Sequence, residues 1–95
     1  MATESVSKVV VVSNPMGLHA RPAAQLVHLA NRFKADLKLC RVDEDNKEAD
    51  CRSVLSILML AAGKNTALEL RASGEDAVEA LASLADFFDR SFDEN

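Results

Sequence analysis

The alternation of apolar and polar side chains along the chain predicts four β-strands. The β-branched run over residues 6–13 is too short for a helix and predicts the first strand. Period-two alternation predicts strands over residues 36–42 and 66–72. A short strand over residues 48–51 follows the polar turn at 43–47, so it forms a hairpin with the segment 36–42.

Apolar residues at helical spacing predict three helices between these strands. The first runs from Ala20 to about Phe33 and leaves Ala20, Ala24 and His28 on the face opposite its buried stripe. The second lies within residues 53–63, with Ser53 as its N-cap. The third starts at residues 73–76, where Ser73 and Asp76 have the spacing of a capping box, and its apolar stripe runs from Val78 to Phe88.

The second predicted helix is apolar nearly all the way round. Seven of the eight residues from Val54 to Ala61 are apolar, and a helix this short cannot bury every side. We therefore expect part of its surface to be exposed as a docking site, formed by Val54, Leu55 and Leu58. A wholly buried connector is the alternative.

The order of elements predicts a single α+β domain over residues 1–95. Strands and helices follow one another as β-α-β-β-α-β-α, with short connections and no internal repeat. One apolar face per element is typical of a two-layer domain, in which three helices cover one side of a mostly antiparallel four-stranded sheet.

Composition excludes several classes of function. The net charge of -4 and the aromatic content of 4% are unlike a nucleic-acid-binding surface. No apolar run reaches the roughly 20 residues of a membrane span, and the N-terminus lacks a signal-peptide pattern, so we expect a cytoplasmic protein without membrane contact. Cys40 and Cys51 fall on opposite faces of the predicted hairpin and have no ligand spacing, so neither a disulfide nor a metal site is expected.

The segment from Asn14 to Pro22 concentrates the candidate chemistry. Pro22 belongs in the first turn of a helix, which puts His19 at or just before the helix N-terminus. Free N–H groups and the helix dipole favour an anion there and keep the imidazole neutral. A lone histidine in this position is usually a cap or a surface residue, but Arg21 adds a permanent cation for phosphate oxygens. This combination predicts a phosphoryl acceptor.

The sequence Gly17-Leu18-His19-Ala20-Arg21-Pro22-Ala23 resembles the active-site signature of the HPr family, the phosphocarriers of the bacterial phosphoenolpyruvate-dependent phosphotransferase system. The resemblance extends from about Val9 to Phe88 and implies an open-faced β-sandwich with the first and last strands side by side. It implies that Enzyme I phosphorylates His19 on Nδ1, that a downstream protein takes the group, and that Ala20, Arg21 and Pro22 surround the phosphate. Such a protein is a monomeric phosphoryl carrier with a transient phosphohistidine rather than a turnover enzyme, and it needs no cofactor.

The resemblance also places Ser53 where many family members carry a regulatory serine that an ATP-dependent kinase modifies. A plain N-cap explains the serine equally well. The alternative function is a regulatory binding module that keeps the fold and docks transcription factors or kinases through Val54, Leu55 and Leu58. A third option, a structural dimerisation domain, rests on the apolar second helix alone. Only Arg21 and Arg52 are expected as firm positive charges on the docking face.

Overall fold

The computed structural model describes residues 5–44 and 47–94 of the 95-residue chain. The N-terminal segment discussed above for its lack of a signal peptide, the tip of the hairpin at residues 45–46 and Asn95 lie outside the described residues. The elements are, in order, β1 (Ser5–Val11), α1 (Ala20–Ala30), β2 (Asp36–Arg41), β3 (Glu48–Asp50), α2 (Val54–Met59), β4 (Ala67–Ser73), α3 (Ala77–Asp89) and a short 3-10 helix, η1 (Ser91–Asp93).

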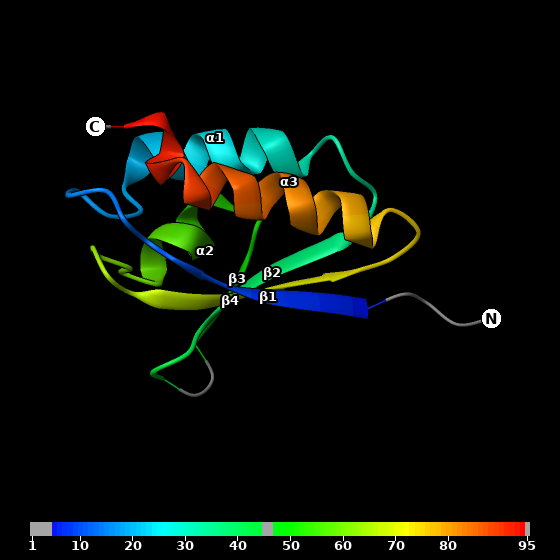
Figure 1. The fold of residues 1–95 in the computed structure, drawn as a ribbon, viewed down its shortest axis with the longest axis horizontal. Coiled ribbons are helices and arrows are strands. Elements are labelled where there is room, and N and C mark those ends of the chain that lie inside the picture. The colour runs from blue at the N-terminus through cyan, green and yellow to red at the C-terminus, as the bar shows by residue number, and fades with distance from the viewer. Residues whose placement is uncertain (1–4, 45–46, 95) are drawn as a thin grey trace.

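The four strands form one antiparallel sheet in the order β1-β4-β2-β3. The first and last strands are therefore neighbours, and the three α-helices lie on one side of the sheet (Figure 1). This arrangement confirms the predicted α+β class and the β-α-β-β-α-β-α order. Only η1, which follows α3, was absent from the predicted pattern.

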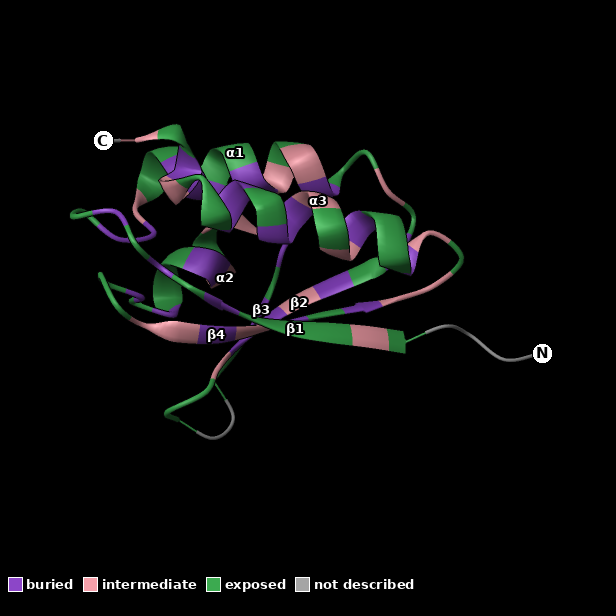
Figure 2. Cartoon of the chain, viewed as in Figure 1, coloured by how far each residue is buried: buried purple, intermediate pink, exposed green. Residues whose placement is uncertain are grey.

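The register of the sheet puts the predicted apolar residues on its helix-covered face. Leu39 lies opposite Leu70 on one side and Ala49 on the other, and all three are buried. Figure 2 shows the buried side of α1 and α3 turned toward the sheet and their exposed side turned away. Hydrophobic burial across this single interface is the main stabilising term of the fold.

The two cysteines are free: Cys40 lies in β2 opposite Glu48, and Cys51 directly follows β3. Cys51 is fully buried, and desolvation raises the pKa of its thiol to about 12. A thiol with so high a pKa is protonated at neutral pH and chemically inert. Burial also raises the pKa of Cys40, which packs beside Glu48.

Two predicted details of α3 are wrong. Val78 is 52% exposed, because Ala77 and Ala80 occupy the buried side of the helix instead. Ser73 is the last residue of β4 and caps nothing, so no capping box forms. The N-cap is Asp76, whose carboxylate accepts hydrogen bonds from the backbone N–H groups of Lys34 and Ala35 at 2.9 and 2.8 Å.

These hydrogen bonds give Asp76 a tertiary role. The donation from Lys34 N–H lowers the pKa of its carboxyl group, and the bond from Ala35 adds to the effect. The carboxylate therefore stays ionised and ties the turn between α1 and β2 to the start of α3.

Gly17 makes a close backbone contact in the loop between β1 and α1. Its φ of +72° lies in the left-handed region, and an added Cβ would lie 2.7 Å from the carbonyl oxygen of Ala62 and 2.8 Å from Cα of Gly63. The same loop donates a hydrogen bond from Leu18 N–H to the Ala62 carbonyl oxygen at 2.9 Å. A side chain at position 17 would therefore force apart the β1–α1 loop and the α2–β4 loop, which contains Ala62 and Gly63.

Among the helices that the structure describes, none is long and apolar enough to cross a membrane.

Replacing Gly17 with alanine is expected to lower the free energy of unfolding by about 1 to 3 kcal/mol, because the substitution adds backbone strain and a clash with backbone atoms. Gly63→Ala is the matched control, since a Cβ there meets nothing within 4 Å; its effect should stay within about 0.5 kcal/mol. Urea unfolding followed by circular dichroism measures both. Equal losses in the two variants would contradict the contact described here.

Candidate functional site

The loop between β1 and α1 places His19 at the N-cap of α1. The turn is closed by hydrogen bonds from Gly17 N–H to the Asn14 carbonyl oxygen and from His19 N–H to the Gly17 carbonyl oxygen. Leu18 anchors the loop, because its side chain is buried in the core. The imidazole consequently points away from the core, with 28% of its side chain exposed.

Among the residues that the structure describes, no side chain caps the first N–H donors of α1. The His19 side chain makes no capping hydrogen bond, and the first turn contains no acidic residue. Ala23 N–H bonds to the His19 carbonyl oxygen, and Pro22, which is buried, has no N–H. The backbone N–H groups of Ala20 and Arg21 therefore lack helical acceptors beside the imidazole, where an anion is favoured.

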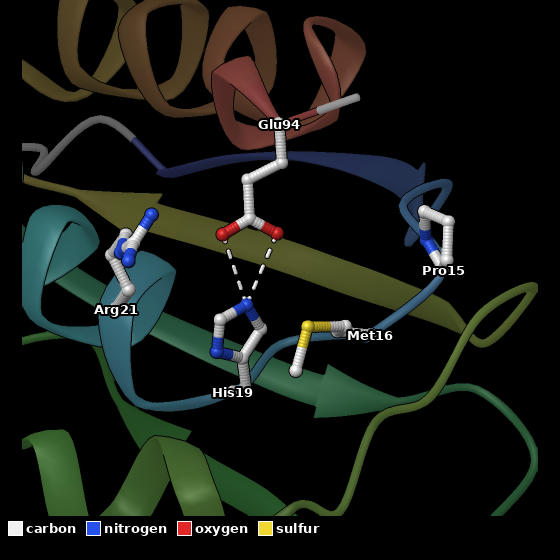
Figure 3. Close-up of a pocket in the computed structure, with 5 residues that line it drawn as sticks. All are labelled: Pro15, Met16, His19, Arg21 and Glu94. Atoms are coloured by element: carbon white, nitrogen blue, oxygen red, sulfur yellow. Dashed lines mark hydrogen bonds and ion pairs between the residues drawn. The ribbon is translucent and has the colours of Figure 1, made fainter.

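A carboxylate from the C-terminal tail meets the imidazole. The two oxygens of Glu94 lie 3.1 and 2.9 Å from Nε2 of His19 (Figure 3). Asn14 supports this contact: its Nδ2 group donates to Oε1 of Glu94 and to the Gly17 carbonyl oxygen, both at 2.8 Å. The hydrogen bond from His19 is the main cause of a lowered pKa of Glu94, and Asn14 and the charge of Arg21 add to it.

The second ring nitrogen is free of this carboxylate. Nδ1 lies on the side of the imidazole that faces the first turn of α1 (Figure 3). The side chains of His19, Arg21 and Glu94, together with Pro15 and Met16, line an open pocket of about 400 Å³. Residues 5–44 and 47–94 contain no group of three or more His, Cys, Asp or Glu side chains that is suited to a metal ion.

A family model described as "PTS HPr component phosphorylation site" matches residues 6–90, which include this loop and helix start. The chain belongs to the HPr family. It is 40% identical over 91 residues to the phosphocarrier protein NPr of Klebsiella oxytoca, covering 96% of this chain and 99% of the relative. It is 39% identical over 85 residues to the phosphocarrier protein HPr of Pseudomonas aeruginosa, covering 90% and 92% of the two chains.

A solved structure supports the same conclusion. The HPr-like fold superposes on HPr-C-His from Thermoanaerobacter tengcongensis with a TM-score of 0.85 and 31% identity, over 95% of this chain and 98% of that one. Family membership implies partner proteins of the phosphotransferase system. It also agrees with the predicted fold, in which the first and last strands of the open-faced sandwich are adjacent.

The surface formed by α1 and α2 is partly apolar. Leu55 is 69% and Leu58 37% exposed, while Val54 is half-buried, so α2 is not a wholly buried connector. On α1, Ala20, Ala24 and His28 are all exposed. His28 also lines a groove between α1 and the end of α3, together with Arg32 and Arg90.

The expected positive charge of Arg52 is used within the fold. Its guanidinium donates to the carbonyl oxygens of Ala30 and Phe33 at the end of α1. Ala30 is the last residue of α1 and its carbonyl oxygen also accepts from Phe33 N–H, while Phe33 lies in the turn that follows the helix. Arginine side chains often bond to carbonyl oxygens at a helix C-terminus. Arg52 is therefore a helix-capping residue, and Arg21 is the exposed cation beside His19.

Ser53 is the N-cap of α2, and its hydroxyl oxygen accepts a hydrogen bond from Ser56 N–H at 3.2 Å. The residue is partly exposed, so its hydroxyl group satisfies the helix start at the surface. This geometry explains the serine as a cap.

Sequence reasoning missed Glu94 and Asn14. Asn14 begins the segment of candidate chemistry, but no sequence pattern indicates that it is buried and holds both the loop and Glu94. Phe92 is buried against Phe87 and Phe88, at ring-centroid distances of 5.2 and 4.9 Å. An apolar residue directly before the acidic end was the one signal available.

Proposed function

We propose that this protein is a phosphocarrier in which Nδ1 of His19 accepts a phosphoryl group from Enzyme I and passes it to a downstream protein of the phosphotransferase system. One observation carries the proposal: the imidazole lies at an uncapped helix start, with a carboxylate at Nε2 and Nδ1 on the side of the bare N–H groups. Family membership supplies the class of partner.

The transfer needs little chemistry from the protein itself. The lone pair of Nδ1 attacks the phosphorus atom in line with the donor, and the bond to the donor breaks with its electron pair staying on the donor. The phosphoryl oxygens of the new phosphoramidate are negatively charged, and the N–H groups of Ala20 and Arg21 and the Arg21 guanidinium stabilise them. Pro22 contributes by setting the backbone of this turn. The reverse step hands the group to an acceptor.

Incubation with phosphoenolpyruvate and the cognate Enzyme I is expected to produce an acid-labile, alkali-stable adduct on the wild-type protein. His19→Ala should abolish the adduct. His28→Ala should still be labelled to the wild-type extent after long incubation, since His28 lies outside the pocket with His19 and Arg21; it controls for the site of labelling and not for its rate, because His28 belongs to the docking surface proposed below. Mass spectrometry of the intact protein and of its peptides measures the labelling. Labelling that survives His19→Ala would refute the assignment.

Arg21→Ala is expected to slow phosphoryl transfer about tenfold or more, because one charged donor to the phosphoryl oxygens is lost. The thermal midpoint should change little, since Arg21 is exposed and makes no ion pair with any residue in the described ranges. Arg32→Ala removes an exposed arginine from just beyond the other end of α1 and serves as the control. A large fall in the midpoint for Arg21→Ala would show a structural role instead.

We propose that Enzyme I and the downstream acceptors dock on the exposed part of α1 and on α2. Ala20, Ala24 and His28 supply the α1 side, and Val54, Leu55 and Leu58 supply the α2 side. The exposed leucines provide apolar contact area close to the phosphorylated ring, because the α2–β4 loop packs on Gly17. A carrier that meets several partners in turn needs such a shared surface.

Phosphorylation of Ser53 by a kinase is proposed as a regulatory step on this surface. A phosphate at the N-cap of α2 would be tolerated by the helix dipole, yet it would add about two negative charges next to the exposed leucines. A regulatory module that works only through α2 would need neither the imidazole nor Arg21 at the pocket. The pocket geometry therefore favours the carrier over that alternative.

Ser53→Asp is expected to reduce the rate of phosphorylation by Enzyme I about tenfold, because it places a negative charge on the docking surface. Ser53→Ala separates this effect from loss of the cap: it should lower stability by about 0.5 to 2 kcal/mol with the transfer rate preserved. Stopped reactions with labelled phosphoenolpyruvate measure the rates. An unchanged rate for Ser53→Asp would remove the basis for the switch.

A further inference from the structure

The C-terminal tail is built to reach the active-site loop. After α3 ends, Ser91, Phe92 and Asp93 all have φ between 53° and 59°, a left-handed conformation that non-glycine residues rarely adopt. Burial of Phe92 against Phe87 and Phe88 holds this turn, and the hydroxyl groups of Ser13 and Ser91 lie 2.6 Å apart. The chain is thereby directed back over the loop, which brings the next residue, Glu94, to His19.

The contact of Glu94 with His19 determines which nitrogen of the neutral ring carries the proton. An ionised carboxylate only accepts hydrogen bonds, so a neutral imidazole in this pair must carry its proton on Nε2. The lowered pKa of Glu94 keeps the carboxylate ionised at neutral pH. Its side chain is only 18% exposed, and Asn14 fixes Oε1 from the other side. Nδ1 is then the nitrogen with the lone pair.

Phosphoryl transfer also creates a charge that this carboxylate balances. When Nδ1 forms its bond to phosphorus while Nε2 keeps its proton, the ring gains imidazolium character and the donor keeps the electron pair of the broken bond. A carboxylate hydrogen-bonded to the far nitrogen stabilises that positive charge, as it does for the acid-paired histidine of serine hydrolases. Glu94 contacts Nε2, and Nδ1 is turned away from the carboxylate (Figure 3), so a phosphoryl group on Nδ1 would not compete with Glu94 for one ring nitrogen.

We propose that Glu94 is a positioning residue for phosphoryl transfer, which holds the proton of His19 on Nε2, presents Nδ1 as the nucleophile and balances the charge that develops on the ring. The inference rests on the proposed function, because it assigns a role within the transfer to His19. It goes beyond that function by making a residue after the matched family region, which ends at residue 90, part of the reaction centre.

Glu94→Gln tests this inference, with Asp93→Asn as the matched control. Both variants remove one negative charge from the same tail segment, but Asp93 pairs with Arg90 and does not contact His19. The glutamine amide both donates and accepts, so it no longer forces Nε2 to carry the proton. Nitrogen-15 NMR of the neutral ring reports the proton position without any phosphoryl donor present.

The wild-type protein and Asp93→Asn are expected to show His19 almost wholly as the Nε2–H tautomer, whereas Glu94→Gln should show a mixture. In single-turnover reactions with phosphorylated Enzyme I, the rate at saturating donor should fall about tenfold for Glu94→Gln, with the half-saturating donor concentration nearly unchanged. If Asp93→Asn retains the wild-type rate, the change in net charge alone does not explain the slower transfer in Glu94→Gln.

Two results would overturn the inference: an unaltered tautomer in Glu94→Gln, or a transfer rate equal to or faster than that of the wild type. A faster rate would mean that the tail only shields the ring. Failure of the proposed function is recognisable separately, because the wild-type protein would then carry no adduct on His19. Normal wild-type labelling together with an unchanged Glu94→Gln rate refutes the role of Glu94 alone.

Discussion

The contact between the β1–α1 loop and the α2–β4 loop holds His19 in place. Two hydrogen bonds continue the β1–β4 pairing to this point, from Val12 N–H to Thr66 O and from Asn65 N–H to Val12 O. Leu18 N–H then bonds to Ala62 O, and Gly17 packs on the same backbone with no space for a side chain. Because the sheet register fixes these loops, it also fixes where α1 begins and where the imidazole lies.

The electrostatic arrangement around His19 combines two distant parts of the sequence, the start of α1 and the C-terminal tail. The helix start and Arg21 offer N–H donors and a cation on one side of the ring, while Glu94 offers a carboxylate on the other. A site that favours an anion and a counter-charge are thus separated across one imidazole. This separation agrees with the proposed receipt and release of a phosphoryl group.

The short helix α2 leaves much of its apolar surface exposed. With six residues it cannot bury an all-round apolar surface, and only Ile57 is fully covered. Leu55 and Met59 are 69% and 68% exposed, and Met16 in the pocket is 73% exposed. Flexible methionine and leucine side chains adapt to different contact surfaces, which agrees with a carrier that docks to more than one protein.

The sequence by itself determined the element order, the buried faces of the strands and the position of His19 relative to α1. These features depend on local rules, namely side-chain periodicity and the confinement of Pro22 to a first helical turn. Local rules failed for Ser73 and Asp76, because the Asp76 carboxylate is used by the backbone of Lys34 and Ala35 from another element. Side-chain periodicity also predicted a buried Val78, which is exposed because Ala77 and Ala80 occupy the side of α3 that packs on the core.

Only the tertiary structure decided what surrounds the imidazole. Asn14 and Glu94 are 80 positions apart and share a hydrogen bond, and no periodicity in either segment encodes that meeting. Arg52 likewise became a cap for the end of α1 instead of an exposed cation. The physical reason is the same in each case: a polar side chain bonds to whichever donor or acceptor the folded backbone brings within reach, and that proximity exists only after the sheet and helices have packed.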